Sequence, residues 1–514
     1  MLAHVDSLAA LGVDAYGVQV EVDVSQGSIS YAVVGLPDAA VRESGERVRA
    51  AIRNSGFSMP ARRVTVNLAP ADTKKQGPSF DLPIALGVLI GDGQLKPKLD
   101  NFAAVGELGL NGEVRSITGV LPMALGARQL GKRALLVPKA NGAEAAVVEG
   151  VDVFPVESLA DALQLLREAN REPLSSHVDM SDEPYHEDIL DWSDVKGQEG
   201  VKRAMEIAAA GGHNILLVGS PGSGKTLLSR RLPTILPPMQ LNEALEVTKL
   251  YSVAGLLGAG RSLIKTRPFR SPHHTVSHAG LVGGGSYPRP GEISLAHNGV
   301  LFLDELPEFH RDVLEVMRQP LEDGNVSIAR AAQTLTFPAQ FQLVGAMNPC
   351  PCGSLLANSS GISHVKPCTC TAPQIRRYLA KISGPLLDRI DIHIEVPSLS
   401  PEELMSKRAG ENSAQVRRRV VAARQKQLCR MKGSGIRSNA HMNSKALQQF
   451  CEMDSGTKDM LKAAIAQFNL TGRGYDRILK VSRTIADLEG VPNVEMHHVA
   501  EAINYRSFDR KLFG

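Results

Sequence analysis

The feature that most constrains this chain is a glycine-rich loop between a short apolar run and a helical stretch. The run Asn214–Val218 predicts a buried strand, and Leu227–Leu232 predicts a helix. Between them stands the pattern G-x-x-x-x-G-K-T, formed by Gly219, Ser220, Pro221, Gly222, Ser223, Gly224, Lys225 and Thr226. In this setting backbone N–H groups and a helix N-terminus bind phosphate oxygens, Lys225 reaches the β- and γ-phosphates, and Thr226 ligates Mg²⁺. The loop therefore predicts a nucleotide site within a parallel α/β domain.

An acidic strand end completes the expected metal site. The apolar run Val300–Leu303 leads into Asp304 and Glu305, about 80 residues after the loop. We expect Asp304 to bind Mg²⁺ through water and Glu305 to polarise the attacking water. Asn348 follows the next apolar strand and is expected to orient that water, while Val195 and Gln198, about 20 residues before the loop, are candidates for flanking the adenine.

The patterning along the chain predicts three folded regions and one polar linker. At roughly 150 residues per domain, 514 residues suggest about three domains. Residues 1–167 alternate strands and helices, residues 191–397 repeat strand, glycine turn and helix, and residues 398–514 are mostly helical. Residues 168–190 are acidic and without apolar periodicity, which predicts a solvated linker. The expected class is multidomain α/β with a helical C-terminal region. Within the first region, Val18–Val24 and Ser30–Val34 are expected to pair as strands.

Composition excludes several alternatives. Aromatic residues make up only 4% of the chain, with Trp192 as the single tryptophan, so a base-stacking platform is not expected. The N-terminus has no signal-peptide pattern, and the longest apolar stretch, of about ten residues, is too short to cross a membrane. These features predict a cytoplasmic protein without a membrane partner. The formal charge of +3 is nearly balanced and does not decide for or against nucleic acid.

Four of the six cysteines gather in a short segment. Cys350 and Cys352 form one C-x-C pair, and Cys368 and Cys370 form another after 15 intervening residues. Two such pairs can close a tetrahedral zinc site, and a structural Zn²⁺ would hold the insertion at residues 349–372 together. A redox-active disulfide and free thiols remain alternatives, and His364 is a candidate to replace one thiolate.

Three further motifs carry a family resemblance. The stretches Arg267–Thr275, Gly283–Gly285 and Pro290–His297 are similar to the YifB/ComM family of magnesium-chelatase-like AAA+ ATPases. The resemblance implies ATP and Mg²⁺ as cofactors, an AAA+ core with a helical lid, and a hexameric ring. It also implies that Arg389 is an arginine finger completing a neighbouring subunit's site, and that Arg473 is the sensor-2 arginine of the lid, with Arg477 as a weaker candidate. From the residues alone, surface salt bridges are the alternative role for Arg389 and Arg473.

The N-terminal region resembles a protease domain that lacks one catalytic group. Lys74–Asp81 and Gly106–Arg115 are similar to the Lon protease domain, a ribosomal S5 domain 2-like α+β fold, and to the related domain of the RadA recombination protein. Ser79 stands where the nucleophile would be, but Pro122–Ala124 occupies the place of the lysine that activates it. The domain is therefore expected to be non-proteolytic and to assist ring assembly or bind DNA instead. Substitution of the missing base by an unrelated lysine is the alternative.

Several basic residues are candidates for contacts with DNA or another anionic partner. Residues 327–336 predict a β-hairpin that resembles the pre-sensor-1 hairpin of MCM helicases, with Arg330 at its tip, although a solvated hairpin charge is the alternative. Arg267 and Arg270 lie in a histidine-containing insertion expected to form a second pore loop. Residues 407–437 hold ten basic residues and one acid, which favours an anionic partner.

Together these features predict a ring-forming, ATP-dependent DNA motor. The family resemblance implies a helicase that promotes branch migration in homologous recombination during natural transformation, acting on single-stranded, forked or branched DNA. A chelatase-like ATPase that remodels a protein partner is the main alternative. An ATP-dependent protease is disfavoured by the missing lysine.

Overall fold

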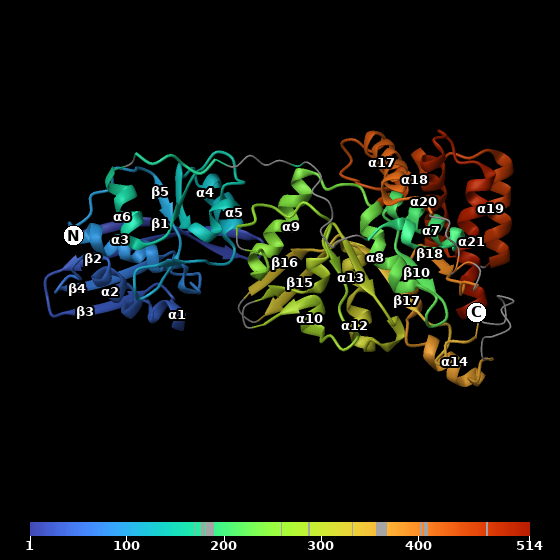
Figure 1. Cartoon of the computed structure of the whole chain (residues 1–514), viewed down its shortest axis with the longest axis horizontal. Coiled ribbons are helices and arrows are strands. Elements are labelled where there is room, and N and C mark those ends of the chain that lie inside the picture. The colour runs from blue at the N-terminus through green and yellow to red at the C-terminus, as the bar shows by residue number, and fades with distance from the viewer. Residues whose placement is uncertain are drawn as a thin grey trace.

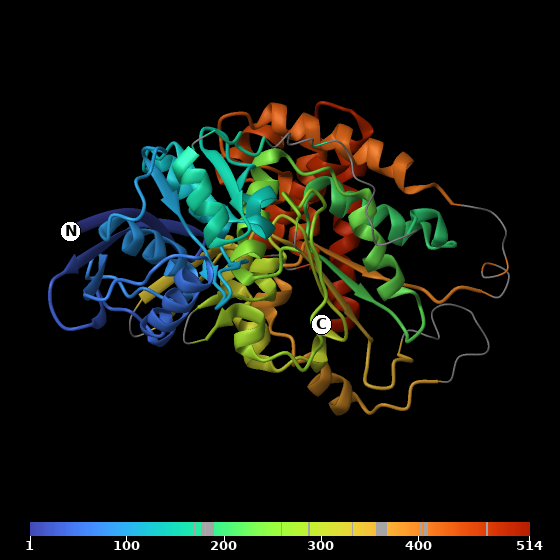
Figure 2. The ribbon, with the colours of Figure 1, turned by 60° about the vertical axis from the view of Figure 1, so that its left-hand side comes forward.

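The computed structural model arranges the chain as three regions along its long axis (Figure 1). It describes residues 1–168, 170–175, 180, 190–258, 260–285, 288–330, 333–355, 367–400, 403, 405, 410–468 and 471–513. Most of the expected acidic linker lies outside the described residues. In Figure 2 the N-terminal domain lies on one side of the central core and the orange and red C-terminal helices pack on another. In the described parts of the chain, no helix combines the length and the apolar character needed to cross a membrane.

The N-terminal domain is built on a seven-stranded mixed sheet of order β3-β4-β2-β1-β5-β8-β9. Its strands are β1 (Leu2–Leu11), β2 (Asp14–Ser25), β3 (Ser30–Val34), β4 (Arg63–Ala69), β5 (Phe102–Ala104), β8 (Ala134–Pro138) and β9 (Asp152–Val156), and a small hairpin joins β6 (Glu107–Leu108) to β7 (Val114–Arg115). The expected pairing of β2 with β3 is wrong, because β4 lies between them. The β3–β4 connection contains helices and returns β4 parallel to β3.

Six helices pack on this sheet and give the domain its own apolar core. They are α1 (Ala39–Arg42), α2 (Ser44–Asn54), α3 (Asp81–Gly91), α4 (Val120–Gln129), α5 (Gly142–Ala145) and α6 (Leu159–Glu168). The helix α3 is buried along almost its whole length, since ten of its eleven residues are inaccessible to solvent. The helical stretch at residues 39–54 is divided at Glu43, which ends α1 and precedes α2.

The central core is a five-stranded parallel sheet of order β11-β14-β17-β10-β18. Its strands are β10 (Ile215–Val218), β11 (Phe269–Arg270), β14 (Val300–Leu303), β17 (Gln342–Met347) and β18 (Ile392–Glu395). The strands β10, β14 and β17 are buried at every position, as parallel strands covered on both faces must be. Because β17 lies between β14 and β10, the chain segments that leave these three strands emerge side by side at one edge.

Helices and short hairpins surround the core sheet. The helices are α7 (Glu199–Gly211), α8 (Lys225–Ile235), α9 (Leu241–Ala254), α10 (His278–Val282), α11 (Glu292–Leu295), α12 (Arg311–Val316), α13 (Arg318–Asp323), α14 (Ala372–Leu379) and α15 (Gly384–Leu387). The expected hairpin is present as β15 (Asn325–Arg330) and β16 (Gln333–Pro338), and a second small hairpin pairs β12 (Gly283–Gly284) with β13 (Arg289–Pro290).

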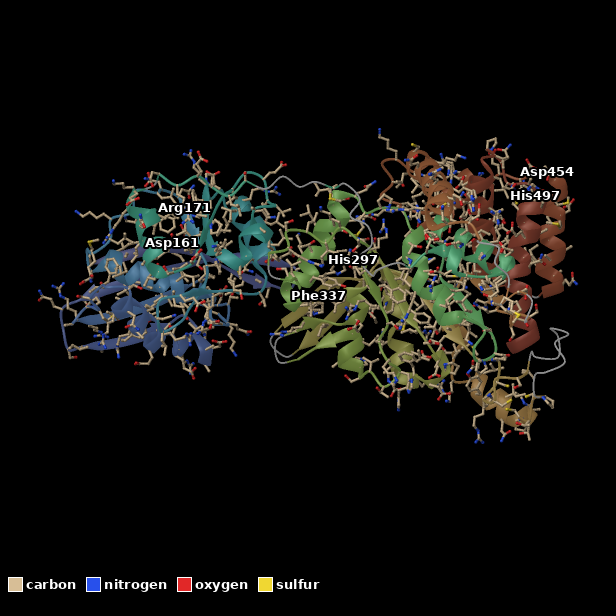
Figure 3. All side chains as sticks on the ribbon, in the orientation of Figure 1. Asp161, Arg171, His297, Phe337, Asp454 and His497 are labelled. Carbon is tan, nitrogen blue, oxygen red and sulfur yellow. The ribbon has the colours of Figure 1, made fainter. Side chains whose placement is uncertain are left out.

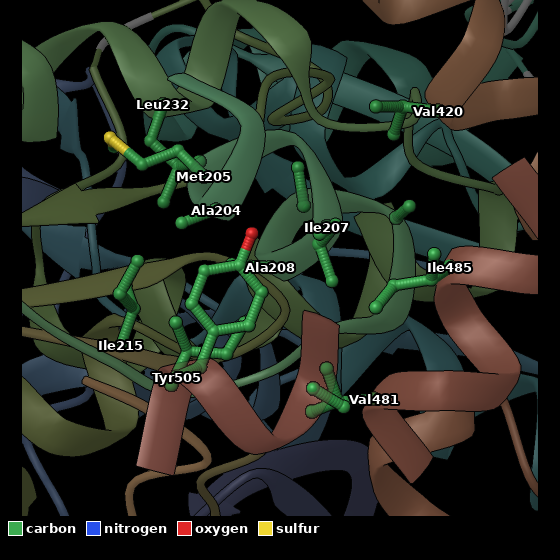
Figure 4. Packing of buried hydrophobic residues seen from close by; sticks show 14 of the residues in the cluster. Ala204, Met205, Ile207, Ala208, Ile215, Leu232, Val420, Val481, Ile485 and Tyr505 are labelled. Atoms are coloured by element: carbon green, nitrogen blue, oxygen red, sulfur yellow. The ribbon is translucent and has the colours of Figure 1, made fainter. Parts of the chain in front are cut away.

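The C-terminal region is helical, as expected, and packs on α7. Its helices are α17 (Ser413–Arg430), α18 (Ser444–Phe450), α19 (Ser455–Phe468), α20 (Gly472–Glu489) and α21 (Met496–Phe513). Figure 4 shows Val481, Ile485 and Tyr505 of this region beside Ile207 and Ala208 of α7. One apolar cluster therefore spans the core and the helical region, which couples the folding of the two.

The N-terminal domain contacts the core at several places, among them α9 and the hairpin β15–β16. The Ser252 side chain of α9 donates a hydrogen bond to the buried carboxylate of Glu144, and the Gly119 N–H donates to the Ser252 carbonyl at 3.1 Å. The hairpin strand β16 also approaches the turn between β1 and β2, where a Cβ on Gly12 would lie 3.7 Å from Leu335. Phe337, on the same strand, is fully buried on the side of the core that faces the N-terminal domain (Figure 3).

Candidate functional site

The glycine-rich loop has the form required to surround phosphate groups. It begins where β10 ends, and α8 begins at Lys225. Gly222 and Gly224 adopt φ of +79° and +94°, a region where a Cβ is unfavourable, so glycine is required for this turn. The first turn of α8 directs its free N–H groups toward the space enclosed by the loop.

Lys225 is held inside the loop by three oxygen acceptors. Its Nζ donates to the carbonyls of Gly219 at 2.7 Å and Ser220 at 3.0 Å, and to Asn348 Oδ1 at 3.2 Å. Burial lowers the pKa of Lys225, and the nearby carboxylates of Asp304 and Glu305 oppose that shift. The ammonium therefore stands in a partly dehydrated site, where its attraction for a phosphate is stronger than in water.

The acidic strand end meets the loop as expected. Thr226 Oγ1 donates to Asp304 Oδ2 at 2.7 Å, which places two oxygen ligands of the kind Mg²⁺ prefers next to each other. Glu305 follows with φ of +51°, and its N–H donates to Asp304 Oδ1 at 2.9 Å. This bend turns Glu305 away from the strand, leaving its side chain 57% exposed and 3.5 Å from His274 Nδ1. The proximity of His274 to Glu305 was not predicted, because the histidine was assigned to a separate loop.

Val195 and Gln198 occupy the region next to the loop. Val195 is only 2% exposed and belongs to the apolar cluster of the core. Gln198 adopts φ of +56°, and its side-chain amide donates to the carbonyls of Ser223 and Pro397, each at 2.8 Å. These bonds tie the loop to the end of β18. Their role beside an adenine ring stays a prediction.

Arg389 and Arg473 meet at a different place from the loop. Both guanidinium groups pair with Glu322, Arg473 at 3.5 Å, and the hydrogen bond from Arg389 lowers the pKa of Glu322. They line a cavity of about 620 Å³ together with Asn214, whose side chain donates to the Arg389 carbonyl at 2.8 Å. Asn214 precedes β10, so this arginine pocket lies at the amino end of the strand whose carboxyl end carries the loop.

A buried polar network joins the arginine pocket to the helical region. Asp391 accepts from His213 Nδ1 at 3.0 Å, His213 Nε2 lies 2.8 Å from Thr484 Oγ1, and Arg477 Nε lies 3.4 Å from Asp391. Burial opposes ionisation of Asp391, but the hydrogen bond and charge of these partners hold its pKa below the usual range. Of these residues, the family resemblance implied only Arg477, as an alternative sensor-2 arginine. These residues are far apart along the chain, so the sequence does not indicate that they contact one another.

The four clustered cysteines converge as predicted. Their sulfurs all lie within 4.8 Å of one another, and the Sγ–Sγ distances include 3.4 Å for Cys350–Cys352, 3.7 Å for Cys350–Cys368 and 3.5 Å for Cys352–Cys368. A tetrahedral Zn²⁺ with four thiolates separates its sulfurs by about 3.8 Å, so the donor set fits that ion. None of the described cysteines forms a disulfide. His364, the alternative ligand, lies outside the described residues.

The residues proposed to contact DNA differ in their surroundings. Arg267 donates to the carbonyls of Pro237 and Asn298, each at 2.6 Å, and pairs with Glu243 at 2.9 Å. Arg270 forms two bonds of 2.6 Å with Glu292. These contacts give both arginines structural roles and disfavour them as free contacts for DNA. Arg330 ends β15 beside the hairpin tip, and its side chain is outside the described residues.

Most of the described basic side chains at residues 407–437 have ion-pair or hydrogen-bond partners within the protein. Arg419 pairs with Glu206 at 2.5 Å and with Glu411 at 2.7 Å, and Arg430 pairs with Asp487 at 2.7 Å. Arg424, Lys426 and Arg437 also contact acceptors on neighbouring elements. The expectation that the run marks an anionic partner is therefore weakened, because the fold supplies partners for most of its described charges.

The protease-like site in the N-terminal domain lacks its expected base. Ser79 lies in a short 3-10 turn before α3 and is 7% exposed. The segment Pro122–Ala124 is buried in α4, as expected for a site without the matched lysine. Lys75, noted in the sequence only as part of the motif, is fully buried, and its Nζ has no hydrogen-bond partner among the described residues. Burial lowers the pKa of Lys75.

Comparisons with known proteins agree with this arrangement. Three magnesium-chelatase family models match the chain: "Magnesium chelatase, subunit ChlI" at residues 191–404, "Subunit ChlI of Mg-chelatase" at 20–141 and "Magnesium chelatase, subunit ChlI C-terminal" at 410–506. The chain is 45% identical to competence protein ComM of Haemophilus influenzae, over 99% of this chain and 98% of that protein. It is 42% identical to YifB of Escherichia coli over the same shares. Lon protease 2 of Bacillus subtilis is 28% identical over 31% of this chain and 33% of its own length.

Proposed function

The chain belongs to the ComM/YifB family of magnesium-chelatase-like AAA+ proteins, and from this premise we propose that it hydrolyses ATP to move DNA. The observation that carries the proposal is the contact of Lys225 with Asn348 and of Thr226 with Asp304. These contacts join the phosphate loop, the metal-binding strand end and the water-orienting residue in one site. ATP and Mg²⁺ are the cofactors that suit it.

The residues of the site divide the hydrolysis between them. Lys225 and the loop N–H groups neutralise charge on the β- and γ-phosphates, and Thr226 and Asp304 hold Mg²⁺, which supplies Lewis-acid stabilisation when bound. Glu305 polarises the attacking water, and Asn348 orients it. Glu305 has room to move toward that water, because its side chain is 57% exposed, with His274 Nδ1 3.5 Å from its carboxylate.

A ring follows if Arg389 and Arg473 take part in hydrolysis. The strand β18 starts three residues after Arg389 and runs parallel to β10, with Ile392 opposite Ile215. At about 3.3 Å per residue, Asn214 and Gly219, which flank β10, are roughly 16 Å apart, so Arg389 is remote from its own phosphate loop. The two arginines therefore act on ATP bound to a neighbouring subunit, and repetition of that contact closes a ring, for which a homo-hexamer is expected.

DNA is the proposed substrate of the motor. The name of the Haemophilus relative links it to competence, and we extend that link to this chain as a helicase that promotes branch migration during natural transformation. The hairpin β15–β16 presents the backbone of Arg330 at its tip, and a basic residue there can contact phosphates. Because aromatic residues make up only 4% of the chain, we expect the protein to contact the phosphates of DNA rather than stack on its bases. The cytoplasm is the expected location.

We also propose that the four cysteines hold a structural Zn²⁺. The support is the mutual approach of the four sulfurs to within 4.8 Å. Backbone N–H groups of Ser354 and Thr369 point at Cys352, and such hydrogen bonds stabilise a metal-bound thiolate.

A second candidate function is a chelatase-like ATPase that remodels a protein partner. It is favoured by the match of three magnesium-chelatase family models to 20–141, 191–404 and 410–506. Proteolysis is disfavoured, because Pro122–Ala124 offers no base to Ser79. Loss of casein degradation in Ser79→Ala would revive it.

The deciding experiment measures ATP hydrolysis by the full chain against single-stranded, forked and four-stranded DNA. We expect branched DNA to stimulate hydrolysis at least about 5-fold and to be unwound, and Lys225→Ala to abolish both activities. Arg330→Ala is expected to keep basal hydrolysis but lose the stimulation. Strand displacement by Lys225→Ala, or stimulation by a protein partner with none by any DNA, would contradict the DNA-motor proposal.

A further inference from the structure

The turn that follows the first cysteine pair packs against the nucleotide site. Cys350 follows Asn348 by two residues and is fully buried. The chain then turns at Gly353, which adopts φ of +82° and donates its N–H to the Cys350 carbonyl at 3.0 Å. This turn lies against the phosphate loop, since a Cβ on Gly353 would be 2.4 Å from Pro221 Cδ. No side chain fits between them, so the turn and the loop must move together.

The second cysteine pair is linked to the region of Asn348 through the helix α14. Cys370 precedes Thr371, the N-cap of α14. Near the other end of that helix, Tyr378 is 7% exposed and packs in the same apolar cluster as Met347, the residue before Asn348. Both pairs are therefore connected to the region of Asn348, one along the chain and one through α14. The two routes meet at the four sulfurs.

Only a ligand of the sulfurs can hold this meeting point together. Thiol groups are weak hydrogen-bond donors and acceptors, so four neutral thiols attract one another little. A thiophilic divalent ion, by contrast, binds all four at once and stabilises the fold of the segment that supplies them. Without the ion, only weak thiol contacts would link Cys352 to Cys370. The turn at Gly353 and the helix α14 would then no longer be held at a fixed distance from each other.

We propose that Zn²⁺ bound by the four cysteines positions Asn348 and the phosphate loop, so that zinc occupancy determines how well this protein binds and hydrolyses ATP. The inference rests on the ATP hydrolysis and zinc site proposed above, and it adds a role beyond stabilising the insertion. The cysteines are positioning residues, because they act on the nucleotide through Asn348 and Pro221.

The test compares two exposed cysteines in the full chain. Cys352→Ser removes a ligand, whereas Cys429→Ser, on α17, changes a cysteine outside the cluster. We expect the first variant to lose bound zinc, measured by metal analysis, and to lower kcat and the affinity for a fluorescent ATP analogue at least about 10-fold. The second should keep both. Cys352→His, which restores a nitrogen ligand for zinc, should recover most of the metal and the activity.

A variant that leaves the thiols intact separates positioning from folding. Gly353→Ala keeps all four ligands but forces the turn away from Pro221. We expect it to retain zinc and to bind the ATP analogue several-fold more weakly. A wild-type chain without zinc, or a zinc-free Cys352→Ser with normal ATP affinity, would overturn the inference. If the wild type binds ATP without hydrolysing it, the proposed function fails, while the affinity measurements still decide this inference.

Discussion

The sites at the two ends of strand β10 differ in how many of their groups already contact one another. At the carboxyl end, Lys225 and Thr226 already contact Asn348 and Asp304, so the nucleotide site is assembled within one chain. At the amino end, Arg389 and Arg473 share only Glu322, which is 53% exposed. The first arrangement is a complete set of groups for phosphate and metal. The second is a pair of cations, partly neutralised by an acid that an incoming anion can displace.

If the proposed ring forms, this difference indicates which groups one subunit supplies to the site of its neighbour. An assembled site binds nucleotide without large rearrangement, whereas two arginines that share one carboxylate gain a stronger partner when an anion enters from outside. The distance along β10 keeps the arginines from the loop of the same chain. We therefore expect changes at the carboxyl end to act within a subunit and changes at the amino end to act between subunits.

The largest effect is expected from Asp304→Asn. Loss of one carboxylate charge beside Thr226 should weaken Mg²⁺ binding and lower ATP hydrolysis about 1,000-fold. A steady-state assay over a range of Mg²⁺ concentrations measures the change. Asp312→Asn is the matched control, since Asp312 is 85% exposed and faces His310. An Asp304 variant with normal Mg²⁺ dependence would show that this end of β10 is not the metal site.

A smaller effect, with a different signature, is expected from Arg389→Ala. Hydrolysis should fall about 100-fold while ATP affinity stays unchanged, because the arginine stabilises charge that develops during the reaction. Mixing Arg389→Ala subunits with Lys225→Ala subunits should restore part of the rate, since some interfaces then contain one intact site.

The control for this mixture is Arg318→Ala, because Arg318 pairs locally with Glu315 at 2.6 Å. It should hydrolyse ATP at the normal rate. If the Arg389 and Lys225 variants never complement each other, the division of the site between subunits is wrong.

The smallest effect concerns the docking of the helical region that carries Arg473. Glu246 of α9 pairs with Arg437 at 3.2 Å and lies 3.1 Å from His297 Nε2. The hydrogen bond with His297, opposed by burial and aided by Arg437, lowers the pKa of Glu246 to about 2. Because the folded pKa is below the unfolded one, this stabilisation is complete above about pH 4.5 and is lost as the pH falls toward 2.

Glu246→Gln should therefore lower the free energy of unfolding by about 1–2 kcal/mol at pH 6, after allowing for solvent screening, and by less at pH 3.5. Urea unfolding at the two pH values measures the difference. Glu149→Gln, at an exposed position of the N-terminal domain, should show no such dependence. An equal loss at both pH values would assign the effect to packing rather than charge.

Some parts of the site were predictable because they depend on short segments. The glycine turn, the strand ends at Asp304 and Asn348, and the cysteine pairs each lie within a few residues of a strong local signal. A buried apolar strand must end at a loop, and parallel strands bring their carboxyl ends together. The convergence of Lys225 and Asn348 followed from those two rules.

The partners of the basic residues were not predictable in the same way. Arg419 finds Glu206 across 213 residues of sequence, and Arg267 is enclosed by carbonyls of a preceding loop. A long charged side chain has many possible acceptors, and only the packing of whole elements selects one. For this reason the run at residues 407–437 looked like a surface for an anion, although the fold uses much of it internally.

The sequence by itself determined the chemistry of the nucleotide site, the helical character of the C-terminal region and the two cysteine pairs, because each follows from local backbone and side-chain requirements. The tertiary structure alone decided that Gly353 lies against Pro221, that Glu322 joins Arg389 to Arg473, and that β4 separates β2 from β3. These are contacts between segments far apart in the chain. They depend on the order of strands and the packing of helices, which no short stretch of sequence specifies.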